Sequence, residues 1–423
     1  MKKTLLSIIS FFVFIFCFGT NTFAEGEAEA RWVLKNEAPT QIVGSATAEA
    51  NGKIYLFGGV SSSSTDLIKT VYEYDPINDS WIRKNDMPFT ATATTASTVD
   101  GKIYIFGGYT GNGYTMTGGI VLSSVYVYDP LLDTWEVKQN MPIGKAWASS
   151  VTYEDKIYII GGIISSKTAT VATVEVYNTK TNTWTTAASM PSALHGVGLT
   201  VFNDKIYAVG GGNGLTSYKN VREYDPKTNI WTDKANLLIA KDGSGTVVLN
   251  GLIYSIGGGA TSGQSLSDVE VYNPIKDMWE EAPSLNIART GFGTAVVNGK
   301  IYVVGGGVFN PFNLTKTVEE FTPATVPTEP NPTPEPEPTG ERAIISITFT
   351  TGLEKEYDLS MDEVNAFLSW YDAKDSGSGP SKYAIDKHNN NKGPFSKRTD
   401  YVIFNNILTF EVNEYEITSS RAM

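Results

Sequence analysis

Cysteine is almost absent from this chain. Among 423 residues the only one is Cys17, which lies inside an apolar run near the N-terminus. If that run is removed during export, no thiol remains, which excludes disulfide bonds and thiol catalysis. The phenylalanines on either side of Cys17 are not the small residues of a lipoprotein cleavage site.

Histidine is scarce as well. Only His195 and His388 occur, and they fall in different predicted domains. No Ser-His-Asp, His-Glu-x-x-His or EF-hand spacing is present, and the many glycine-rich loops do not precede helical patterns, as a phosphate-binding loop would. The sequence therefore predicts no metal site and no cofactor.

Positive charge is in short supply. The chain has 33 Lys and Arg against 45 Asp and Glu, a formal net charge of -12. Nucleic acids and anionic membranes are bound mainly by neutralising phosphates with cationic side chains. We therefore expect neither as a partner.

Long apolar runs are limited to the first 24 residues. Lys2 and Lys3 precede an apolar run from Leu5 to Gly19, and small residues lead to Ala24. The run is short for a membrane span and has the layout of a secretory signal. We expect cleavage after Ala24, no membrane span afterwards, and a secreted or cell-surface protein, from a Gram-positive bacterium.

What the chain does have is a repeat of about 50 residues. A period of this length indicates stacked supersecondary units. Its first mark is a pair of glycines, which we expect where backbone must approach backbone. The pairs are Gly58 and Gly59, Gly107 and Gly108, Gly161 and Gly162, Gly210 and Gly211, Gly257 and Gly258, and Gly305 and Gly306.

The second mark is a tryptophan, which fixes the number of units. It recurs at Trp81, Trp135, Trp184, Trp231 and Trp279. The sixth copy has Thr328 where a tryptophan is due, while an additional one, Trp32, precedes the first copy. A closed ring leaves no open sheet edge between the first and last units. We therefore predict six blades, with the strand that carries Trp32 completing the sixth.

The residues between these marks predict strands and tight turns. Lys53 to Phe57 is rich in β-branched and aromatic residues, which suit a pleated sheet. Asn-Gly or Asp-Gly pairs favour two-residue hairpins because both positions need positive φ. Such pairs occur at Asn51-Gly52, Asp100-Gly101, Asn250-Gly251 and Asn298-Gly299.

Paired glycines, a Tyr-Asp-Pro turn and a spaced tryptophan in repeats of this length resemble the kelch-repeat β-propeller family. The resemblance covers residues 31 to 325, with mild departures such as Asn178-Thr179 in place of Asp-Pro. It implies one of several functions, since kelch propellers include protein-binding platforms, sugar-handling enzymes and copper radical oxidases. The oxidases are excluded, because their cofactor needs a cysteine.

A second domain is predicted after the propeller (25–325). Residues 326–340 alternate proline with polar or acidic residues and predict an extended linker. Residues 341–423 read as a small α+β module, in which Ser360 and Glu363 form a capping box that begins a helix. The module faintly resembles an uncharacterised tail of exported proteins from spore-forming Gram-positive bacteria. Its basic residues from Lys382 to Arg398 predict a solvated loop, or alternatively a hold on anionic wall polymer.

The loops between second and third strands and between blades share one face of a propeller, and they vary most here. Binding residues concentrate on such loops. The second-to-third loops are 60–70, 109–124, 163–173, 212–220, 259–268 and 307–317.

Equivalent positions before the first strands predict the site itself. Eleven residues before the second strands stand three cations, Lys145, Lys241 and Arg289, and the next position adds His195 and Asp242. The position after that has Trp147, where four repeats have glycine and one has Ala93. We expect these six residues at the axial mouth, ringed by Tyr109, Tyr114, Tyr218, Phe309 and Phe312. The alternative is that Trp147 only fills the channel, and that the charges are solvated or bind neighbouring carbonyls.

Two functions of different class fit this pattern. The first is a secreted, monomeric, non-catalytic protein that binds a glycan or a protein at the cell surface, with the C-terminal module providing association with the cell wall. The alternative is a sugar-acting enzyme that resembles bacterial kelch sialic acid mutarotases, in which cations hold a carboxylate and Asp242 or His195 moves protons.

Overall fold

The computed structural model describes residues 30–61, 66–112, 115–309, 313–323, 341–350, 354–386 and 399–416. The predicted signal segment (1–24) and linker (326–340) lie outside the described residues. The chain divides into two compact units, Met1–Val326 and Pro327–Met423, which are taken separately below.

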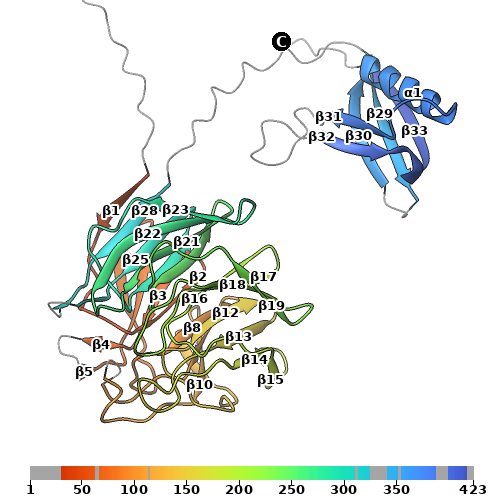
Figure 1. The fold of residues 1–423 in the computed structure, drawn as a ribbon. Coiled ribbons are helices and arrows are strands. Elements are labelled where there is room, and N and C mark those ends of the chain that lie inside the picture. Colours follow the sequence, from red (N-terminus) through yellow and green to blue (C-terminus); the bar gives the residue numbers. More distant parts are fainter. Residues whose placement is uncertain are drawn as a thin grey trace, which may run out of the picture. The chain divides into compact units, whose positions relative to one another are not determined.

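The described part of the first unit forms a β-propeller of four-stranded antiparallel sheets, as the repeats predict (Figure 1). We name the sheets blades 1 to 6 in the order of their innermost strands. Blade 1 consists of β2 (Ala46–Ala50), β3 (Lys53–Phe57), β6 (Val71–Asp75) and β7 (Ser80–Lys84). Blade 2 consists of β8 (Thr95–Val99), β9 (Lys102–Phe106), β10 (Val125–Asp129) and β11 (Thr134–Val137). Blade 3 consists of β12 (Ser149–Tyr153), β13 (Lys156–Ile160), β14 (Val174–Asn178) and β15 (Thr183–Ala187).

Blades 4 to 6 follow the same plan. Blade 4 consists of β16 (Gly198–Phe202), β17 (Lys205–Val209), β18 (Val221–Asp225) and β19 (Ile230–Lys234). Blade 5 consists of β20 (Gly245–Leu249), β21 (Leu252–Gly259), β22 (Ser265–Asn273) and β23 (Met278–Ala282). Blade 6 consists of β24 (Gly293–Val297), β25 (Lys300–Val304), β28 (Val318–Thr322) and β1 (Arg31–Lys35). Two short hairpins, β4 (Val60–Ser61) with β5 (Asp66–Leu67) and β26 (Gly307–Val308) with β27 (Asn313–Leu314), lie in second-to-third loops.

The innermost strands surround an axis. In the described residues they contact one another in the order β2, β8, β12, β16, β20 and β24, and β24 contacts β2. The last blade contains both ends of the repeat region, because β1 pairs with β28 and places Trp32 opposite Phe321.

Each repeat tryptophan also ties its blade to the preceding one. Its Nε1 donates to a backbone carbonyl four residues after the preceding tryptophan of the ring. The pairs are Trp81 to Asn36, Trp135 to Asn85, Trp184 to Gln139, Trp231 to Ala188, Trp279 to Ala235 and Trp32 to Pro283.

The first glycine of each pair lies where neighbouring blades come close together. Gly107, for example, has a φ of +58°, which favours glycine. A methyl group built on it would lie 2.2 Å from the carbonyl oxygen of Lys145 in the next blade. The predicted Asn51-Gly52 turn also has two positive φ angles, 54° and 74°.

The second glycine of each pair lies against its own blade rather than the next one. A methyl group on it would lie 2.4 to 2.9 Å from the segment that leads into the first strand of the same blade. The φ angles of these glycines, between 95° and 107°, also favour glycine. They are Gly59, Gly108, Gly162, Gly211, Gly258 and Gly306. The close approach predicted for the pairs is therefore found, but the two glycines of a pair approach different partners. For Gly108, Gly162, Gly211 and Gly306 the nearest atom is a side-chain carbon rather than a backbone atom.

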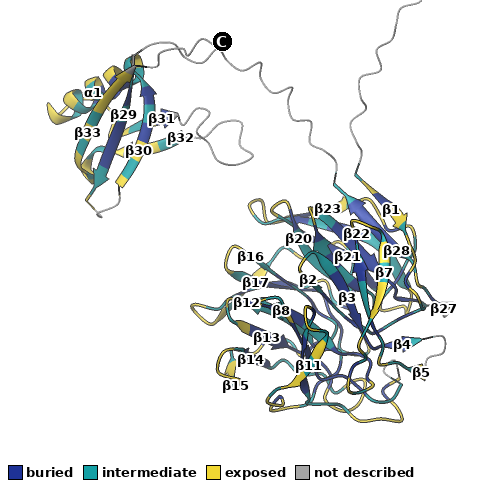
Figure 2. Cartoon of the chain, turned by 180° about the vertical axis from the view of Figure 1, so that it is seen from behind, coloured by how far each residue is buried: buried dark blue, intermediate teal, exposed yellow. Residues whose placement is uncertain are grey.

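The apolar core lies between blades. Tyr302 and Val304 of blade 6, for example, pack with Ile54, Leu56 and Tyr74 of blade 1. Figure 2 shows the second and third strands mostly buried and the outermost strands largely exposed. The large aromatic and β-branched residues of the repeat therefore join adjacent sheets.

The second unit is α+β, as the sequence predicts. Its sheet has the order β30 (Glu354–Ser360), β29 (Glu341–Phe349) and β33 (Ile407–Glu416), with a hairpin of β31 (Lys382–Asp386) and β32 (Thr399–Ile403) and a 3-10 turn at Phe404–Asn406. Helix α1 (Met361–Asp375) begins at the predicted capping box of Ser360 and Glu363. Lys382 belongs to β31 and not to a basic loop, and the rest of that predicted loop, 387–398, lies outside the described residues.

The aromatic face of α1 belongs to the core of this unit. Val364, Phe367 and Trp370 are buried against Ile345 and Ile347 of β29. The tryptophan Nε1 donates to the carbonyl oxygen of Pro380 at 2.9 Å. Within the described residues, none of the helices has the length and apolar character needed to span a lipid bilayer.

Candidate functional site

A ring of six residues with positive φ surrounds the propeller axis. Each stands just before the first strand of its blade: Gly44, Ala93, Trp147, Gly196, Gly243 and Gly291, with φ between 51° and 65°. The backbone N–H of five of them, Gly291 excepted, donates to the carbonyl of the equivalent residue in the preceding blade, over 2.8 to 3.0 Å. We call this feature the axial ring. Its positive φ angles explain why four of the six positions are glycine.

Trp147 is the exception in the axial ring. Its φ of 51° is unusual for a bulky residue and costs backbone energy. Its indole extends across the axis, because methyl groups built on Gly44 and Gly291 would lie 3.4 and 3.6 Å from its Cη2. Gly291 belongs to blade 6, which is opposite blade 3 in the ring. The indole therefore closes the centre of the ring, as the channel-filling alternative expects.

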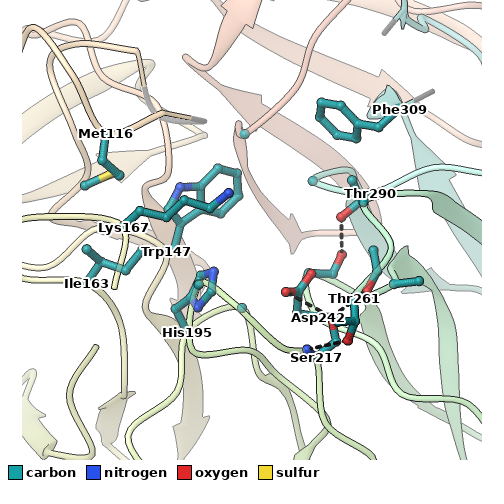
Figure 3. A pocket seen from close by; sticks show the side chains of 18 of the residues that line it. Met116, Trp147, Ile163, Lys167, His195, Ser217, Asp242, Thr261, Thr290 and Phe309 are labelled. Atoms are coloured by element: carbon teal, nitrogen blue, oxygen red, sulfur yellow. Dashed lines mark hydrogen bonds between the residues drawn. The ribbon is translucent and has the colours of Figure 1, made fainter. Parts of the chain in front are cut away.

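A cavity of about 200 Å³ lies on the loop face of the axial ring. Trp147 forms part of its lining, and loops from several blades complete it (Figure 3). Met116, Ile163 and Phe309 give the wall apolar surface, whereas His195 and Asp242 give it polar groups. Apolar walls with a few convergent polar groups are typical of small-ligand sites.

His195 and Asp242 stand at equivalent positions of neighbouring blades, 4 and 5. His195 Nδ1 lies 2.7 Å from the carbonyl oxygen of Gly212. A carbonyl only accepts, so Nδ1 donates, and in the neutral ring Nε2 is left as an acceptor. Burial lowers the pKa of His195 below 6.5, although the Asp242 charge and the bond to Gly212 oppose the shift.

The carboxylate of Asp242 is held close to backbone. Ser217 Oγ donates to its Oδ2 at 3.4 Å, and methyl groups built on Gly212 and Gly259 would lie 2.4 and 2.9 Å from its oxygens. Burial raises its pKa above 3.8, and His195 and the bond from Ser217 oppose this. The two glycines leave the room that this half-buried carboxylate occupies.

Lys167 is a cation of the cavity that the sequence analysis missed. It lies on the loop between β13 and β14, and its side chain extends beside Trp147 (Figure 3). Its charge lowers the pKa of both His195 and Asp242. A signal was present: in the second-to-third loops the other lysines, Lys69, Lys219 and Lys316, all stand two residues before the third strand, and Lys167 does not.

The three cations that the sequence predicts at the mouth do not line the cavity, which corrects that expectation. Lys145, Lys241 and Arg289 are 1%, 0% and 0% exposed. They pair with glutamates on the third strand of their own blade: Lys145 with Glu175, Lys241 with Glu270 at 2.9 Å, and Arg289 with Glu319 at 2.5 Å.

These buried ion pairs have a structural role. Burial lowers the pKa of Lys145 and Arg289, and their glutamates oppose the shift. Glu270 and Glu319 also accept backbone N–H groups of Leu238 and Asn286. The sequence carried the signal, because Glu stands at this position of the third strand only in blades with a cation. Blades 1, 2 and 4 lack both the cation and the glutamate. They have Ile42, Ala91 and Leu194 at the position of the cation, and Tyr72, Tyr126 and Arg222 at the position of the glutamate.

Of the aromatic residues expected around the mouth, only Phe309 lines the cavity among those described. Tyr109 is 3% exposed and its hydroxyl accepts from the N–H of Gly119, while the Tyr218 hydroxyl accepts from Asn213. Both therefore brace loops. Tyr114, Phe312 and His388 lie outside the described residues. Across the described ranges no cluster of three or more His, Cys, Asp or Glu could hold a metal ion.

Comparison with protein families matches most of the first unit. The model of the KLHDC2/KLHL20/DRC7 Kelch-repeats domain matches residues 14–188 and 113–306, which together exceed half of the chain. The model of the Kelch motif matches residues 288–325.

Curated relatives match over short segments. The chain is 39% identical over 75 residues to an uncharacterized protein of Clostridium acetobutylicum (18% of this chain, 19% of that protein). It is 26% identical over 143 residues to beta-scruin of Limulus polyphemus (34% and 16%) and 27% identical over 150 residues to Kelch-like protein 15 of Danio rerio (32% and 24%). The chain thus spans about a quarter or less of the length of these relatives.

A solved structure titled "Structure of YjhT" shares the fold. It has a TM-score of 0.58 and 17% sequence identity, and covers 67% of this chain and 95% of its own. At this identity the likeness concerns the fold alone.

Proposed function

Because the chain belongs to the kelch-repeat family, whose propellers support binding and interaction, we propose that it is a non-catalytic binding protein that holds a glycan in the loop-face cavity. One observation carries the proposal. A cavity of about 200 Å³ at the centre of the variable face has an aromatic floor, Trp147, and polar groups from His195, Asp242 and Lys167. Its size suits one compact group rather than a broad protein surface.

The chemistry of the lining favours a sugar over an apolar ligand. An indole offers a flat apolar surface to the C–H face of a sugar ring, and half-buried carboxylate and imidazole groups offer hydrogen bonds to hydroxyls. Asp242 accepts, His195 Nε2 accepts in the neutral ring, and Lys167 donates. The positive charge of Lys167 would also attract a carboxylate on the sugar.

Glycan-array binding by the full chain tests this proposal. We expect selective binding of a small set of sugars that Trp147→Ala weakens at least tenfold. Lys180→Ala, which changes a lysine that is 64% exposed and paired with Asp155, is the control and leaves binding unchanged. Absence of any glycan binding, together with binding of a peptide or protein, would show that the ligand is a protein.

A sugar-acting enzyme is the second candidate, because two titratable groups meet in the cavity. Burial lowers the pKa of His195 and raises that of Asp242, and titratable groups with shifted pKa values in a cavity are candidates for proton transfer. Exchange between anomers of any sugar that binds, followed by NMR, separates the two candidates. Binding without accelerated anomer exchange supports the binding protein and eliminates the mutarotase-like enzyme.

We also propose that the protein acts outside the cell or on its surface, as a monomer. The signal-like residues 1–24 support export, and the C-terminal unit offers a second, separate surface for association with the cell wall. N-terminal sequencing of the protein from a culture and its partition between medium and wall test both points. A protein that retains residues 1–24 and stays in the cytoplasm contradicts them.

A further inference from the structure

A second cavity of about 130 Å³ lies against the axial ring and shares Gly44, Trp147, Gly196, Gly243 and Gly291 with the ligand cavity. The other residues that line it follow the ring residues by one or two positions in the sequence, on the side of the first strands. It therefore lies on the other side of the ring from the loop face. We call it the lower chamber.

The lower chamber is polar, and its hydroxyls lack protein partners. Ser45 Oγ, Thr94 Oγ1 and Ser244 Oγ are buried and have no hydrogen-bond partner among the described residues. All three line the chamber. An unsatisfied buried hydroxyl costs about 1–3 kcal/mol, and water is the usual partner where the space is polar and large enough.

The two cavities meet at the axial ring, where Trp147 contributes to both linings. Its indole reaches contact distance of Gly44 and Gly291 across the axis, since the methyl groups built there would lie 3.4 and 3.6 Å from Cη2. Glycine at this position, as in four other blades, would leave that space empty.

The backbone at Trp147 also indicates a role beyond folding. Its φ of 51° would be free of strain with glycine, so the tryptophan is held at a cost that its neighbours in the ring avoid. The ring hydrogen bonds do not require it, because they use backbone atoms and are made by glycine and Ala93 as well. The indole also packs against an apolar cluster that includes Met116 and Ile163.

We infer that Trp147 is a plug that divides the propeller axis into two separate compartments: the ligand cavity on the loop face and a lower, hydroxyl-lined chamber that holds ordered water. The plug limits how deep a ligand can enter and keeps the water of the lower chamber away from it. This inference goes beyond the proposed function and holds whichever ligand binds.

Two engineered cysteines test the barrier, because Cys17 is the only natural one and can be replaced by serine. Ser244→Cys places a thiol in the lower chamber and Gln264→Cys places one in the ligand cavity. The variant with both cysteines is treated with a short bis-maleimide, and mass spectrometry gives the yield of the cross-link between them. We expect this yield to rise at least tenfold once Trp147→Gly is added, because the short path between the two thiols runs through the axial ring.

The ring supplies matched controls. Ala93→Gly changes the equivalent residue of blade 2 but leaves the indole in place, so the cross-link yield should stay low. Trp147→Ala repeats the test with the side chain that blade 2 tolerates at φ 57°, should the glycine variant fold poorly. Equal cross-link yields with and without the indole overturn the plug. Neither result depends on glycan binding, so failure of the proposed function is seen separately.

A crystal structure of the unmodified chain tests the water. We expect solvent density within hydrogen-bond distance of Ser45 Oγ, Thr94 Oγ1 and Ser244 Oγ. A dry chamber contradicts that part of the inference.

Discussion

The indole Nε1 of Trp32 donates a hydrogen bond of 2.7 Å to the carbonyl oxygen of Pro283, 251 residues further along the chain. The same bond joins every other pair of neighbouring blades through its own tryptophan. Here it joins the N-terminal strand to blade 5, while β1 itself pairs with β28 of blade 6. Residues from both ends of the repeat region are thus held together at one place, so we expect the stability of the propeller to depend on it.

Truncation of Trp32 should be among the most destabilising changes to the propeller. Its side chain is 8% exposed and packs on Phe321 with ring centroids 5.1 Å apart. Trp32→Ala should lower the free energy of unfolding by about 3–5 kcal/mol, as buried aromatic truncations do. Leu34→Ala, on the same strand but 57% exposed, is the control and should change it by less than about 0.5 kcal/mol. Equal effects of both substitutions in urea unfolding would contradict the role given to Trp32.

The buried pair of Lys145 and Glu175 should affect stability and leave ligand binding unchanged. Lys145→Ala leaves the Glu175 carboxylate, on a residue 2% exposed, without its partner and should cost about 3–5 kcal/mol. Combining Lys145→Ala with Glu175→Tyr copies Ala91 and Tyr126 of blade 2 and should cost less than the single change, because no charge remains buried.

Urea unfolding of the single and the double variant measures this difference. A double variant less stable than the single one would show that the pair is favourable in itself. Loss of glycan binding in a well-folded variant would show that Lys145 and Glu175 do contribute to the binding site.

His195 should titrate below its ordinary pKa of 6.5. Burial favours the neutral imidazole, and the Asp242 charge opposes it. Asp242→Asn removes that opposition and should lower the pKa further. Because the chain has two histidines, the ring proton signals in NMR are few, and a His195→Gln variant assigns them. A pKa at or above 6.5, or a rise in Asp242→Asn, contradicts the arrangement described.

Acid should weaken the turn that ends β18. The Lys205 ammonium, 2.7 Å away, and the N–H of Lys227 lower the pKa of Asp225 to about 2 from 3.8. A lowered folded-state pKa stabilises the fold above the unfolded value, and that contribution is lost as the pH falls from about 3.8 to about 2. Asp225→Asn should therefore be less stable than the unmodified chain at pH 7, with the difference shrinking toward pH 2. A difference independent of pH in urea unfolding would argue against this.

The propeller could be predicted from the sequence because each repeat contains the same kinds of turn, glycine pair and strand. Asn51-Gly52 fixes a hairpin, and the paired glycines occupy backbone positions that a Cβ would obstruct. Trp32 carried long-range information, since it fits the repeat only as part of the last blade. In the C-terminal unit the capping box at Ser360 located α1, but β30 and β31 have weak patterns and were not predicted.

The site was harder to predict because sequence register gives a residue's place and not the direction of its side chain. The repeat places Lys145, Lys241 and Arg289 at equivalent positions near the axis. Their side chains nevertheless form ion pairs with buried glutamates on the third strand of each blade. His195, Asp242 and Trp147 do reach the cavity. Lys167 lies on a loop whose length varies between blades, so the repeat defines no equivalent position for it. The only sign in the sequence was that Lys167, unlike the other loop lysines, does not stand two residues before the third strand.

The most direct test of the loop-face cavity as the binding site is the dissociation constant of an array-selected glycan, measured by calorimetry on the full chain. Trp147 and Asp242 line the cavity, whereas Lys180 does not. We predict that Trp147→Ala and Asp242→Asn each weaken binding at least tenfold and that Lys180→Ala leaves it unchanged. Unchanged affinity in both cavity variants, with the fold intact by circular dichroism, would contradict the account.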